Sequence, residues 1–507
     1  MPSKKKDQKI KFRLETEIPH LRVISIGVLQ GTWREIGVQY GERCAEDIAR
    51  NFDLAWGNAV LKTEKGIWQQ GKSKKERAAY CAAYIERSHQ ELALLSPELI
   101  ELFDGMGRGA ARQLDGCRYA DAMPHALKIH LLNSSGLHFH PHWDFKKDRP
   151  GKTRKKGYRT RSDDHDCNGF WVKAQATRTG ETFAVRGAQN RHIRPGGSGR
   201  ERQISYVAVP KDKRARVFWG TGRAGNLGGG PGGGVMNDCG VCVLTSGSQY
   251  KAANTRPDES LAPGIKGFIL GTYGVVFSKS AREAARKATV GTQRYRKLSG
   301  RKTVLRARGA NIVFADAKDA FCVEQNARHY AVRRPGDMNE KGGNYLVHAN
   351  HFQFEKGSYD GDDVFNPKLP MTGFTSEENE DRQSSYYRFW SGMWMLHNNY
   401  GKIDRDMIMR DLSASHYAFD KAGKRYDPEP ETGVPTVPGT FCSHMKPFTA
   451  ENPKGIGGNT ETTLFNLSTR EVWWVPVWPC HYKEWNLSWS YLNLAPFSEY
   501  RRLLWGY

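Results

Sequence analysis

Short apolar runs of strand length alternate with amphipathic helical stretches along most of this chain. The clearest case is a pair of strand-like runs, residues 170–176 and 182–187, separated by the polar turn Thr-Arg-Thr-Gly-Glu. This pattern predicts a β-hairpin. Cys167 precedes the first run, so we expect it to open the first strand, and the return strand leads into Gln189 and Asn190.

Helix-start signals are concentrated in the first third of the chain, which we therefore expect to be mainly helical. Thr32 and Glu35 have the spacing of a capping box and predict a helix that runs to about residue 51. Ser96-Pro97 predicts a second helix start, with glycines ending that helix after Phe103. Further helices are expected over 72–90 and 280–298, and residues 384–412 are expected to contain helical material. A short strand and turn is expected within 18–31, and strands are expected at 204–210, 215–220, 312–315, 320–323, 330–333, 344–348, 462–466 and 471–477.

The composition is that of a globular protein with a large core. The chain has 507 residues, 38% hydrophobic and 26% charged, enough for one large domain or two. Its nine cysteines are odd in number and scattered, which argues against a disulfide framework and favours a reducing, cytoplasmic location. We expect residues 1–17 to form a disordered basic tail, without a signal peptide, and no transmembrane helix elsewhere.

The chain is strongly basic. Lysine and arginine outnumber acidic residues 77 to 54, a formal charge of +23 that favours anionic partners or substrates. Zinc-finger spacing, an RRM aromatic signature and basic heptads are all missing, so no specific nucleic-acid partner is expected. The densest basic block, residues 146–161, contains proline and glycine and predicts a surface loop shortly before Asp166.

Three sequence features share residue types with metal, redox or cofactor sites, but none is expected to be one. The alternating His138, His140 and His142 lack a partner acid, and a proline interrupts their strand. Cys239 and Cys242 have redox-motif spacing, but they lie in a strand-like run and are expected to be buried structural residues. The glycine-rich run that follows residue 224 lacks the Gly-Lys-Ser/Thr ending of a phosphate loop.

Cys167 carries the sharpest chemical prediction. A cysteine at the start of a strand, with amide side chains returning beside it, is the geometry of an N-terminal nucleophile. Its own α-amino group, with an ordinary pKa of about 7.7–8.0, would act as the base. This requires cleavage of the Asp166–Cys167 bond, and before cleavage the sulfur can attack the Asp166 carbonyl and release that amine. The alternative is a buried, inert thiol.

Motifs on both sides of Cys167 carry a family resemblance. They are residues 31–42 (Gly-Thr-Trp-Arg-Glu-Ile-Gly-Val-Gln-Tyr-Gly-Glu), 101–110 (Glu-Leu-Phe-Asp-Gly-Met-Gly-Arg-Gly-Ala), 187–190 (Gly-Ala-Gln-Asn), 237–241 (Asn-Asp-Cys-Gly-Val), 311–317 (Asn-Ile-Val-Phe-Ala-Asp-Ala) with Val323-Glu324, 350–352 (Asn-His-Phe), 442–444 (Cys-Ser-His), and the strand pair around Leu464 and Trp473. In this order they resemble the penicillin acyltransferase-like (C45-type) branch of the N-terminal nucleophile (Ntn) hydrolases, over nearly the whole chain.

The resemblance implies a fold and a division of the chain. The fold class would be α+β, a four-layer αββα sandwich of two antiparallel sheets with a largely helical N-terminal segment. Residues 18–166 would become the α-chain after self-cleavage, and residues 167–507 the nucleophile-bearing β-chain.

The resemblance also implies roles for residues around the nucleophile. A residue at the end of the strand that holds Thr245 would polarise the scissile carbonyl. The family usually has asparagine near this point, so the donor here is the Thr245 hydroxyl, a backbone N–H, or a side chain from elsewhere. Asn350 or His351 would orient the substrate or acyl-enzyme; alternatively they cap a strand end, with Phe352 in the core.

One position departs from the family pattern. The family's return strand normally carries an acid two residues beyond the asparagine, where it holds the new α-amino group. Here the sequence reads Asn190-Arg191-His192. Either His192 replaces the acid, or Asp166 or another acid serves, or self-cleavage is slow or absent.

Together these features predict an amide-bond hydrolase or acyltransferase that works through a thioester on Cys167, with Gln189 and Asn190 shaping the site. The expected substrate is a small-molecule amide, with the basic charge favouring one that bears a carboxylate. The two processed fragments would stay associated, and a homo-oligomer is compatible with the aromatic C-terminal segment. The alternative is a non-catalytic basic protein of the same fold that holds anionic partners.

Overall fold

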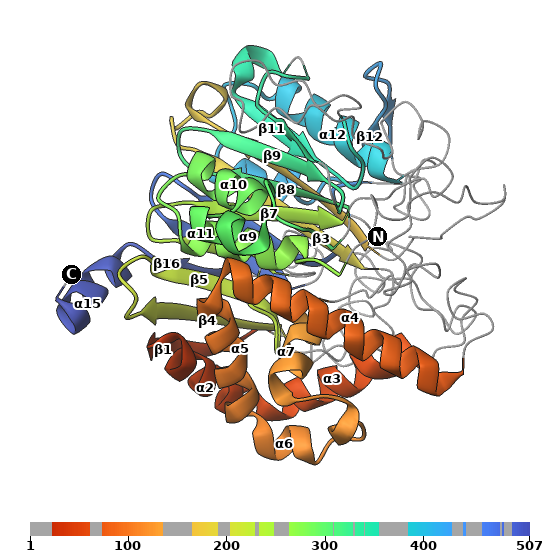
Figure 1. Ribbon diagram of the computed structural model, residues 1–507. Coiled ribbons are helices and arrows are strands. Elements are labelled where there is room, and N and C mark those ends of the chain that lie inside the picture. Colours follow the sequence, from red (N-terminus) through yellow and green to blue (C-terminus); the bar gives the residue numbers. More distant parts are fainter. Residues whose placement is uncertain are drawn as a thin grey trace, which may run out of the picture.

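The computed structural model places two large β-sheets at the centre of the molecule, with helices packed against them (Figure 1). The described residues contain no helix that is both long and apolar enough to cross a lipid bilayer. The structure describes residues 23–60, 73–134, 165–190, 203–228, 233–247, 263–307, 309–327, 330–338, 340–353, 384–427, 440–442, 459–476, 479–480 and 489–506.

The larger sheet has eight strands in the order β1-β4-β5-β6-β7-β8-β9-β10. All neighbouring strands in it are antiparallel except β1 and β4, which are parallel, so the expectation of purely antiparallel sheets is wrong for this one pair. The strands are β1 (Val23–Gly31), β4 (Gln203–Pro210), β5 (Phe218–Arg223), β6 (Val235–Asn237), β7 (Cys242–Gly247), β8 (Ala310–Ala315), β9 (Ala320–Gln325) and β10 (Tyr330–Arg333).

The smaller sheet has six strands in the order β11-β2-β3-β14-β15-β16 and is antiparallel throughout. Its central hairpin, β2 with β3, is the one that the sequence predicts after Cys167. The strands are β2 (His165–Val172), β3 (Phe183–Asn190), β11 (Tyr345–His348), β14 (Asn459–Asn466), β15 (Glu471–Pro476) and β16 (Ser490–Asn493); β12 (Ala418–Phe419) and β13 (Arg425–Tyr426) form a separate ribbon.

The N-terminal third is mainly helical, as expected. Its helices gather beside one end of the larger sheet, whereas α12 lies at the opposite end of the view (Figure 1). The helices are α2 (Trp33–Arg43), α3 (Ala45–Val60), α4 (Lys74–Leu95), α5 (Pro97–Gly109), α6 (Ala111–Asp115), α7 (His125–Asn133), α9 (Gly267–Val276), α10 (Ala281–Val290), α11 (Gln293–Ser299), α12 (Ser384–Asn398), α13 (Arg405–Met407) and α15 (Pro496–Trp505), with a π-helical turn at Ile408–Leu412.

Local capping chemistry accounts for the helix starts. The Thr32 hydroxyl accepts the Glu35 N–H at 3.3 Å, and the Glu35 carboxylate accepts the Thr32 N–H at 2.7 Å, as the capping-box spacing predicts. The expected single helix to residue 51 is instead two helices, because the backbone leaves helical geometry at Cys44. The helix expected over 280–298 likewise divides at Gly291, which has a φ of +68°.

Glycines that were expected to end α5 instead bring it against α2. The helix continues through Gly105 and ends at Gly109. A Cβ atom at Gly105 would lie 2.2 Å from the Arg34 carbonyl oxygen, and one at Gly37 would lie 2.4 Å from the Leu102 carbonyl oxygen. The two helix backbones are therefore in direct contact, and only glycine fits at the crossing.

Three apolar clusters lie on the successive faces of the sheets. Alternation along β2 separates two of them, because Phe170 and Val172 pack with Phe389 of α12, whereas Trp171 packs towards the larger sheet. Between the sheets, Trp219 of β5 meets Trp474 of β15 with ring centroids 5.1 Å apart.

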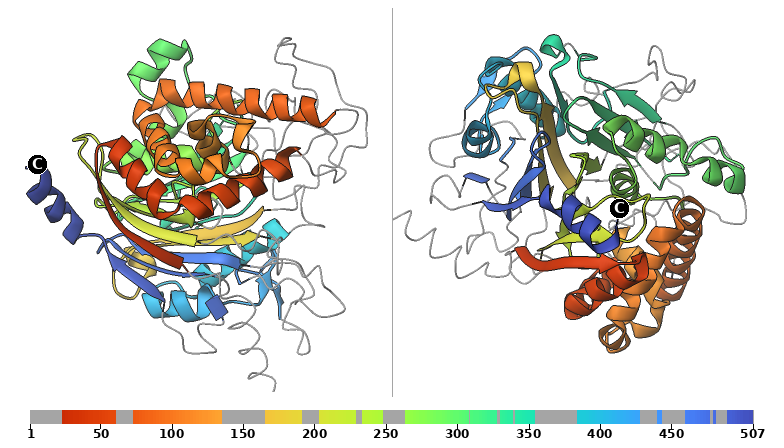
Figure 2. Two further views of the ribbon diagram at one scale, coloured as in Figure 1. Left: turned by 90° about the horizontal axis from the view of Figure 1, so that it is seen from below. Right: turned by 90° about the vertical axis from the view of Figure 1, so that its left-hand side faces the viewer.

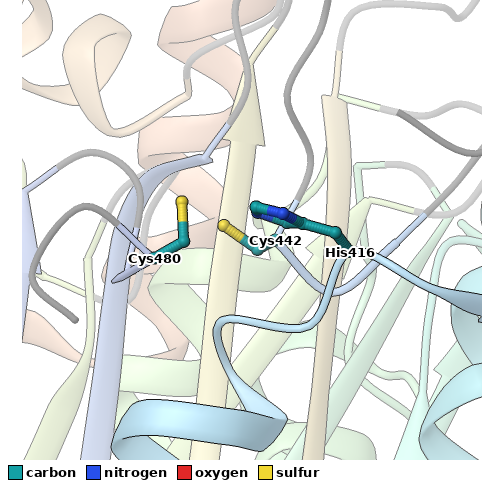
Figure 3. Close-up of side chains that lie close together, drawn as sticks. All are labelled: His416, Cys442 and Cys480. Carbon is teal, nitrogen blue, oxygen red and sulfur yellow. The ribbon is translucent and has the colours of Figure 1, made fainter. Parts of the chain in front are cut away.

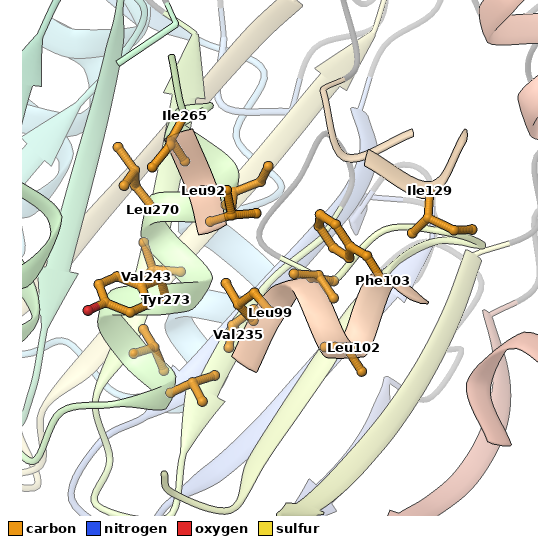
Figure 4. Close-up of a cluster of buried hydrophobic side chains, with 14 of the residues drawn as sticks. Leu92, Leu99, Leu102, Phe103, Ile129, Val235, Val243, Ile265, Leu270 and Tyr273 are labelled. Atoms are coloured by element: carbon orange, nitrogen blue, oxygen red, sulfur yellow. The ribbon is translucent and has the colours of Figure 1, made fainter. Parts of the chain in front are cut away.

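The third cluster joins the outer face of the larger sheet to the helices, with residues such as Val243, Leu99 and Tyr273 in contact (Figure 4). The strands accordingly lie between the N-terminal helices on one side and the light-blue helices near residue 400 on the other (Figure 2). The molecule is α+β, with two large β-sheets and helices packed against them.

Candidate functional site

Cys167 lies in β2 on the face that looks towards the larger sheet. Residues two apart on a strand share a face, so Cys167 lies on the same side as Trp171, which belongs to the core between the sheets. The strand begins two residues before Cys167, because His165 pairs with Asn190 and Asp166 with Gln189. Cys167 is therefore inside the strand of the uncut chain, and it is only 3% exposed.

Two side chains hold the backbone of Cys167 from opposite directions. Its N–H, the nitrogen of the Asp166–Cys167 bond, donates to Asn350 Oδ1 at 2.7 Å. Its carbonyl oxygen accepts from the Arg388 guanidinium, which also donates to Asn350 Oδ1 at 2.8 Å. All three residues are buried, so this clamp fixes the backbone at the predicted cleavage site in a region of low dielectric.

Asn350 is in turn held by other parts of the fold. Its Nδ2 donates to the Gly247 carbonyl at the end of β7 at 2.5 Å, and its backbone N–H donates to the Ser385 hydroxyl of α12 at 2.7 Å. A single asparagine therefore connects β2, the larger sheet and α12. The structure thus brings Asn350 next to Cys167, where its side chain binds the Cys167 backbone.

Arg186 supplies a buried positive charge beside Cys167. It pairs in the sheet with Gly169, so it lies diagonally across from Cys167 on the same face. Its Nε donates to the Thr245 carbonyl at 3.1 Å, and another guanidinium nitrogen donates to the Gly233 carbonyl. Burial lowers the Arg186 pKa, while attraction to Cys167 and Glu461 opposes this change. Sequence reasoning did not identify Arg186, because a strand pattern does not tell which arginine faces inwards.

Glu461 is a buried acid in the same row of the sheet. Cys167 pairs with Ala188, and Ala188 pairs with Glu461, so the small alanine lies between the thiol and the carboxyl group. Burial raises the Glu461 pKa to about 8, although a hydrogen bond from Thr463 and attraction to Arg186 act in the opposite direction. The Thr463 hydroxyl donates to this carboxyl group at 2.6 Å. The neighbouring strand thus places a buried carboxyl group in the same row of the sheet as Cys167.

The raised pKa of Glu461 predicts a pH-dependent stability. Between its ordinary pKa of 4.5 and the folded-state value of about 8, the unfolded chain loses this proton while the folded chain keeps it. The free energy of unfolding should therefore fall as pH rises through this range, by at most about 1.4 kcal/mol per pH unit. Glu461→Gln should remove that slope, as measured by urea unfolding at pH 5 and pH 8. Glu283→Gln, on partly exposed α10, is the matched control and should keep the slope. If the free energies of unfolding of the wild type and Glu461→Gln differ by the same amount at pH 5 and pH 8, the assignment to Glu461 is wrong.

His348 of β11 pairs with Gly169 of β2, two residues from Cys167. A Cβ atom at Gly169 would lie 2.5 Å from His348 Nε2, so glycine makes room for the ring. His348 Nδ1 is 3.2 Å from the Ser246 hydroxyl, which donates to the Ala349 carbonyl at 2.6 Å. Burial, and then repulsion from Arg333, Arg186 and Arg388, lowers the His348 pKa to about 3, so the ring is neutral at physiological pH.

Thr245 is close to the site through its backbone. Val243 and Thr245 share a face of β7, and Val243 packs in the cluster beneath the helices. A Cβ atom at Gly271 of α9 would lie 3.4 Å from the Thr245 methyl carbon, which places this side chain towards the helices. The Thr245 carbonyl, by contrast, accepts from Arg186. The oxyanion role stays a prediction, and this placement favours a donor other than the Thr245 hydroxyl.

His351 lies against α12. Its Nδ1 is 2.6 Å from the Ser385 hydroxyl, its Nε2 is 2.5 Å from Gln353 Nε2, and its ring packs against Phe389 with centroids 5.7 Å apart. Burial is the main cause that lowers its pKa to about 3. Phe352 is buried as well, so the geometry here is that of the strand-end alternative.

The remaining predicted residues are described in part or not at all. The backbones of Gln189 and Asn190 lie opposite Asp166 and His165, while the side chains of all four lie outside the description. His192 falls outside the described residues, as do His138, His140 and His142.

One open hollow of about 410 Å³ lies beside the start of α12. It is lined by Tyr386 and Tyr387 of α12 and by Asp420, Lys421 and Ala422 of the turn between β12 and β13. The same end of α12 carries Ser385 and Arg388, which hold Asn350. Cys167 does not line this hollow.

Comparison with known proteins gives distant structural likenesses. No family model and no curated protein matches the sequence. Two solved structures of conjugated bile acid hydrolase from Clostridium perfringens, each of a single-substitution form of that enzyme, match with a TM-score of 0.34 and 11% and 12% identity. Each comparison covers 65% of this chain and 93% of the other. Penicillin V acylase from Agrobacterium tumefaciens matches with a TM-score of 0.25 and 10% identity, covering 61% of this chain and 83% of the acylase. Similarity at this level carries no argument, so the function below rests on the geometry of the site.

Proposed function

We propose that this protein is an amide-bond hydrolase or acyltransferase of the N-terminal nucleophile type, with Cys167 as the nucleophile after self-cleavage at Asp166–Cys167. The observation that carries the proposal is the clamp on the cleavage site. Asn350 and Arg388 hold the Cys167 N–H and carbonyl oxygen, and buried Arg186 lies beside the thiol. The pairing of β11 with β2 ends at His348 and Gly169, so the Asn350 and Arg388 side chains satisfy the buried peptide groups of Cys167 and hold the scissile bond in one geometry.

The proposal includes the fold. Helices on the outer faces of two sheets, with a separate apolar cluster at each of the three boundaries, support a four-layer αββα arrangement. Residues 18–166 would be the α-chain and residues 167–507 the β-chain. In this arrangement Cys167 faces the neighbouring sheet, at the end of the layer between the two sheets.

Self-cleavage follows from the position of the thiol next to its own peptide bond. The Cys167 sulfur attacks the Asp166 carbonyl carbon, the C–N bond breaks, and the nitrogen takes up a proton to become an α-amine. Water then hydrolyses the thioester, which leaves a carboxylate on Asp166 and the thiol on Cys167. Asn350 Oδ1 already accepts the N–H of this nitrogen, so the new amine would form with its hydrogen-bond partner in place.

Catalysis on a substrate repeats the same chemistry. The α-amine of Cys167 takes the thiol proton, and the thiolate attacks the carbonyl carbon of the substrate amide. The amine part of the substrate then leaves with that proton, and the acyl part stays on the sulfur as a thioester. Water or a second amine then resolves the thioester. The buried Arg186 side chain lies beside the thiol, and Arg388 holds the backbone carbonyl of Cys167. A donor for the oxyanion comes from a backbone N–H or a side chain other than Thr245.

The uncut chain explains why the thiol is shielded. With the Asp166–Cys167 bond intact, Cys167 is 3% exposed, and its strand extends past it to His165. Release of the Asp166 end would uncover the sulfur. The alternative, a non-catalytic basic protein that holds anionic partners, rests on this same burial together with the charge of +23.

Mass spectrometry of the purified wild-type protein separates the two functions. We expect two fragments that part between Asp166 and Cys167 and remain together on gel filtration under native conditions. A panel of N-acyl amino acids and simple anilides should then reveal which amide is hydrolysed. A single intact chain, inert both to this panel and to thiol reagents at Cys167, would favour the binding protein.

A further inference from the structure

Three side chains that no catalytic step uses lie close together. They are His416, Cys442 and Cys480, and their ligand atoms, one imidazole nitrogen and two sulfurs, lie within 4.8 Å of one another (Figure 3). His416 precedes β12, Cys442 belongs to the segment 440–442, and Cys480 follows β15. Cys442 lies in the middle of the group (Figure 3).

The backbone around the cluster is held by hydrogen bonds. The Cys442 N–H donates to the carbonyl of Ser415, the residue before His416, at 3.0 Å. The Thr440 hydroxyl donates to the Cys442 carbonyl at 2.7 Å. Cys442 and Cys480 are 1% and 3% exposed and pack with Ala414 in a small buried cluster of their own. The two thiols and the imidazole are therefore held near one another before any ion arrives.

This set of donors selects a particular kind of ion. Two thiolates and an imidazole are soft and borderline ligands, which zinc binds in tetrahedral geometry and which hard cations such as magnesium do not favour. With Zn–S bonds of about 2.3 Å, two sulfurs on one tetrahedral zinc ion lie about 3.8 Å apart. The observed separation limit of 4.8 Å therefore requires side-chain shifts on the order of 1 Å or less for binding.

We propose that His416, Cys442 and Cys480 bind one zinc ion, with the fourth position open to water or an external ligand. Binding converts two thiols to thiolates and releases two protons, so the affinity rises with pH. The ion would pin together three segments that are far apart in the sequence. Sequence analysis expected no metal site, because these ligands do not form a short-spaced motif.

The zinc site is separate from the chemistry proposed for Cys167. The Phe441 ring packs against Phe170 at 5.7 Å, and the Phe441 carbonyl accepts from Asn168 Nδ2 at 3.4 Å. Asn168 and Phe170 point to the face of β2 opposite to that of Cys167. The segment that carries Cys442 therefore packs against the face of β2 opposite to that of Cys167, and the proposal does not rest on the proposed function.

Metal titration of the full-length protein tests the site. The protein is purified under reducing conditions, stripped with a chelator, and titrated with Co²⁺ and then Zn²⁺. All proteins carry Cys167→Ala, so that the nucleophile thiol cannot contribute. We expect one Co²⁺ per chain with thiolate-to-cobalt charge-transfer absorption, displacement of Co²⁺ by one Zn²⁺, and a higher melting temperature with zinc.

Variants assign the ligands. Cys442→Ser and Cys480→Ser should each halve the charge-transfer intensity and weaken zinc binding by more than about 100-fold, since removal of a direct ligand exceeds the 10–100-fold cost typical of outer partners. His416→Gln should weaken binding while it keeps both thiolate bands. Because His416 is half-buried, that variant also keeps the test valid if a serine variant does not fold. Cys239→Ser, a partly buried cysteine elsewhere, is the control and should bind like the parent.

Three results would overturn the proposal. The first is the absence of stoichiometric metal in reduced, folded protein. The second is metal binding that His416→Gln and both serine variants leave unchanged, which would place the ion on other thiols. The third is a Cys442–Cys480 disulfide in the purified protein together with no metal uptake after its reduction, which would make the two cysteines a redox pair.

Discussion

Cys167→Ala is expected to leave the purified protein as one uncut chain and to abolish amide hydrolysis. The sulfur is both the group that attacks the Asp166 carbonyl and the nucleophile for the substrate, so its removal stops both steps. Loss of a catalytic nucleophile costs on the order of 10⁶ in kcat where it has been measured. Fragment masses and turnover of the amide that the wild type cleaves give the two readouts.

Cys239→Ala provides the matched comparison, because Cys239 is a partly buried thiol outside the Cys167 site. It should be cut and active like the wild type. Fragments of the Cys167→Ala protein that begin at residue 167 would show that another group or a contaminating protease makes the cut, and the proposed mechanism would fail. For the cut wild type, kcat/KM should rise with pH through about 7.7–8.0, as the α-amine loses its proton.

The second large effect is expected at Asn350. Asn350→Leu removes the acceptor of the Cys167 N–H and of Arg388 and the donor to the Gly247 carbonyl. Each buried partner left unsatisfied costs about 1–3 kcal/mol. We therefore expect a lower melting temperature and self-cleavage slowed by about 100-fold or more, as for loss of one preorganised polar group. The time course of fragment appearance after synthesis measures the rate.

A conservative variant distinguishes the clamp from general destabilisation. Asn350→Asp keeps an oxygen for Cys167 and Arg388 but loses the donor to Gly247, so it should cleave faster than Asn350→Leu. Asn344→Leu, at the other end of the same strand region, removes a 2.6 Å bond to the Tyr400 hydroxyl and should lose stability without slowing cleavage. Equal cleavage by all three variants would show that Asn350 does not position the scissile bond.

Local patterns predicted most of the elements. The hairpin that contains Cys167 is formed by β2 and β3, and the strands expected at 204–210, 312–315, 320–323, 330–333, 344–348 and 462–466 are all confirmed. Alternation of apolar residues and capping boxes act over a few residues, so they can be read without the rest of the chain. The predictions were wrong where packing overrode local preference. Gly105, for example, was predicted to end its helix, but its role is to let α5 contact α2.

The candidate site was predicted unevenly. Asn350 was predicted from a motif and does contact Cys167, although the contact is made by its side-chain oxygen, which accepts the peptide N–H of Cys167. Arg186, Arg388 and Glu461 were missed, because each is an ordinary charged residue in the sequence. Their importance comes from burial, which the position of a residue along the chain does not reveal.

The sequence by itself determined that this is a mixed α and β protein with a helical N-terminal third, and that Cys167 belongs to a hairpin, although the first strand begins at His165 rather than at Cys167. These features follow from the period of the side chains and from turn chemistry, which are local. Only the tertiary structure decided which polar groups reach that cysteine. The register Cys167–Ala188–Glu461, the diagonal approach of Arg186, and the grouping of His416 with Cys442 and Cys480 all depend on pairing between distant segments. Such pairing is set by the burial of whole sheet faces, so no short stretch of the sequence contains it.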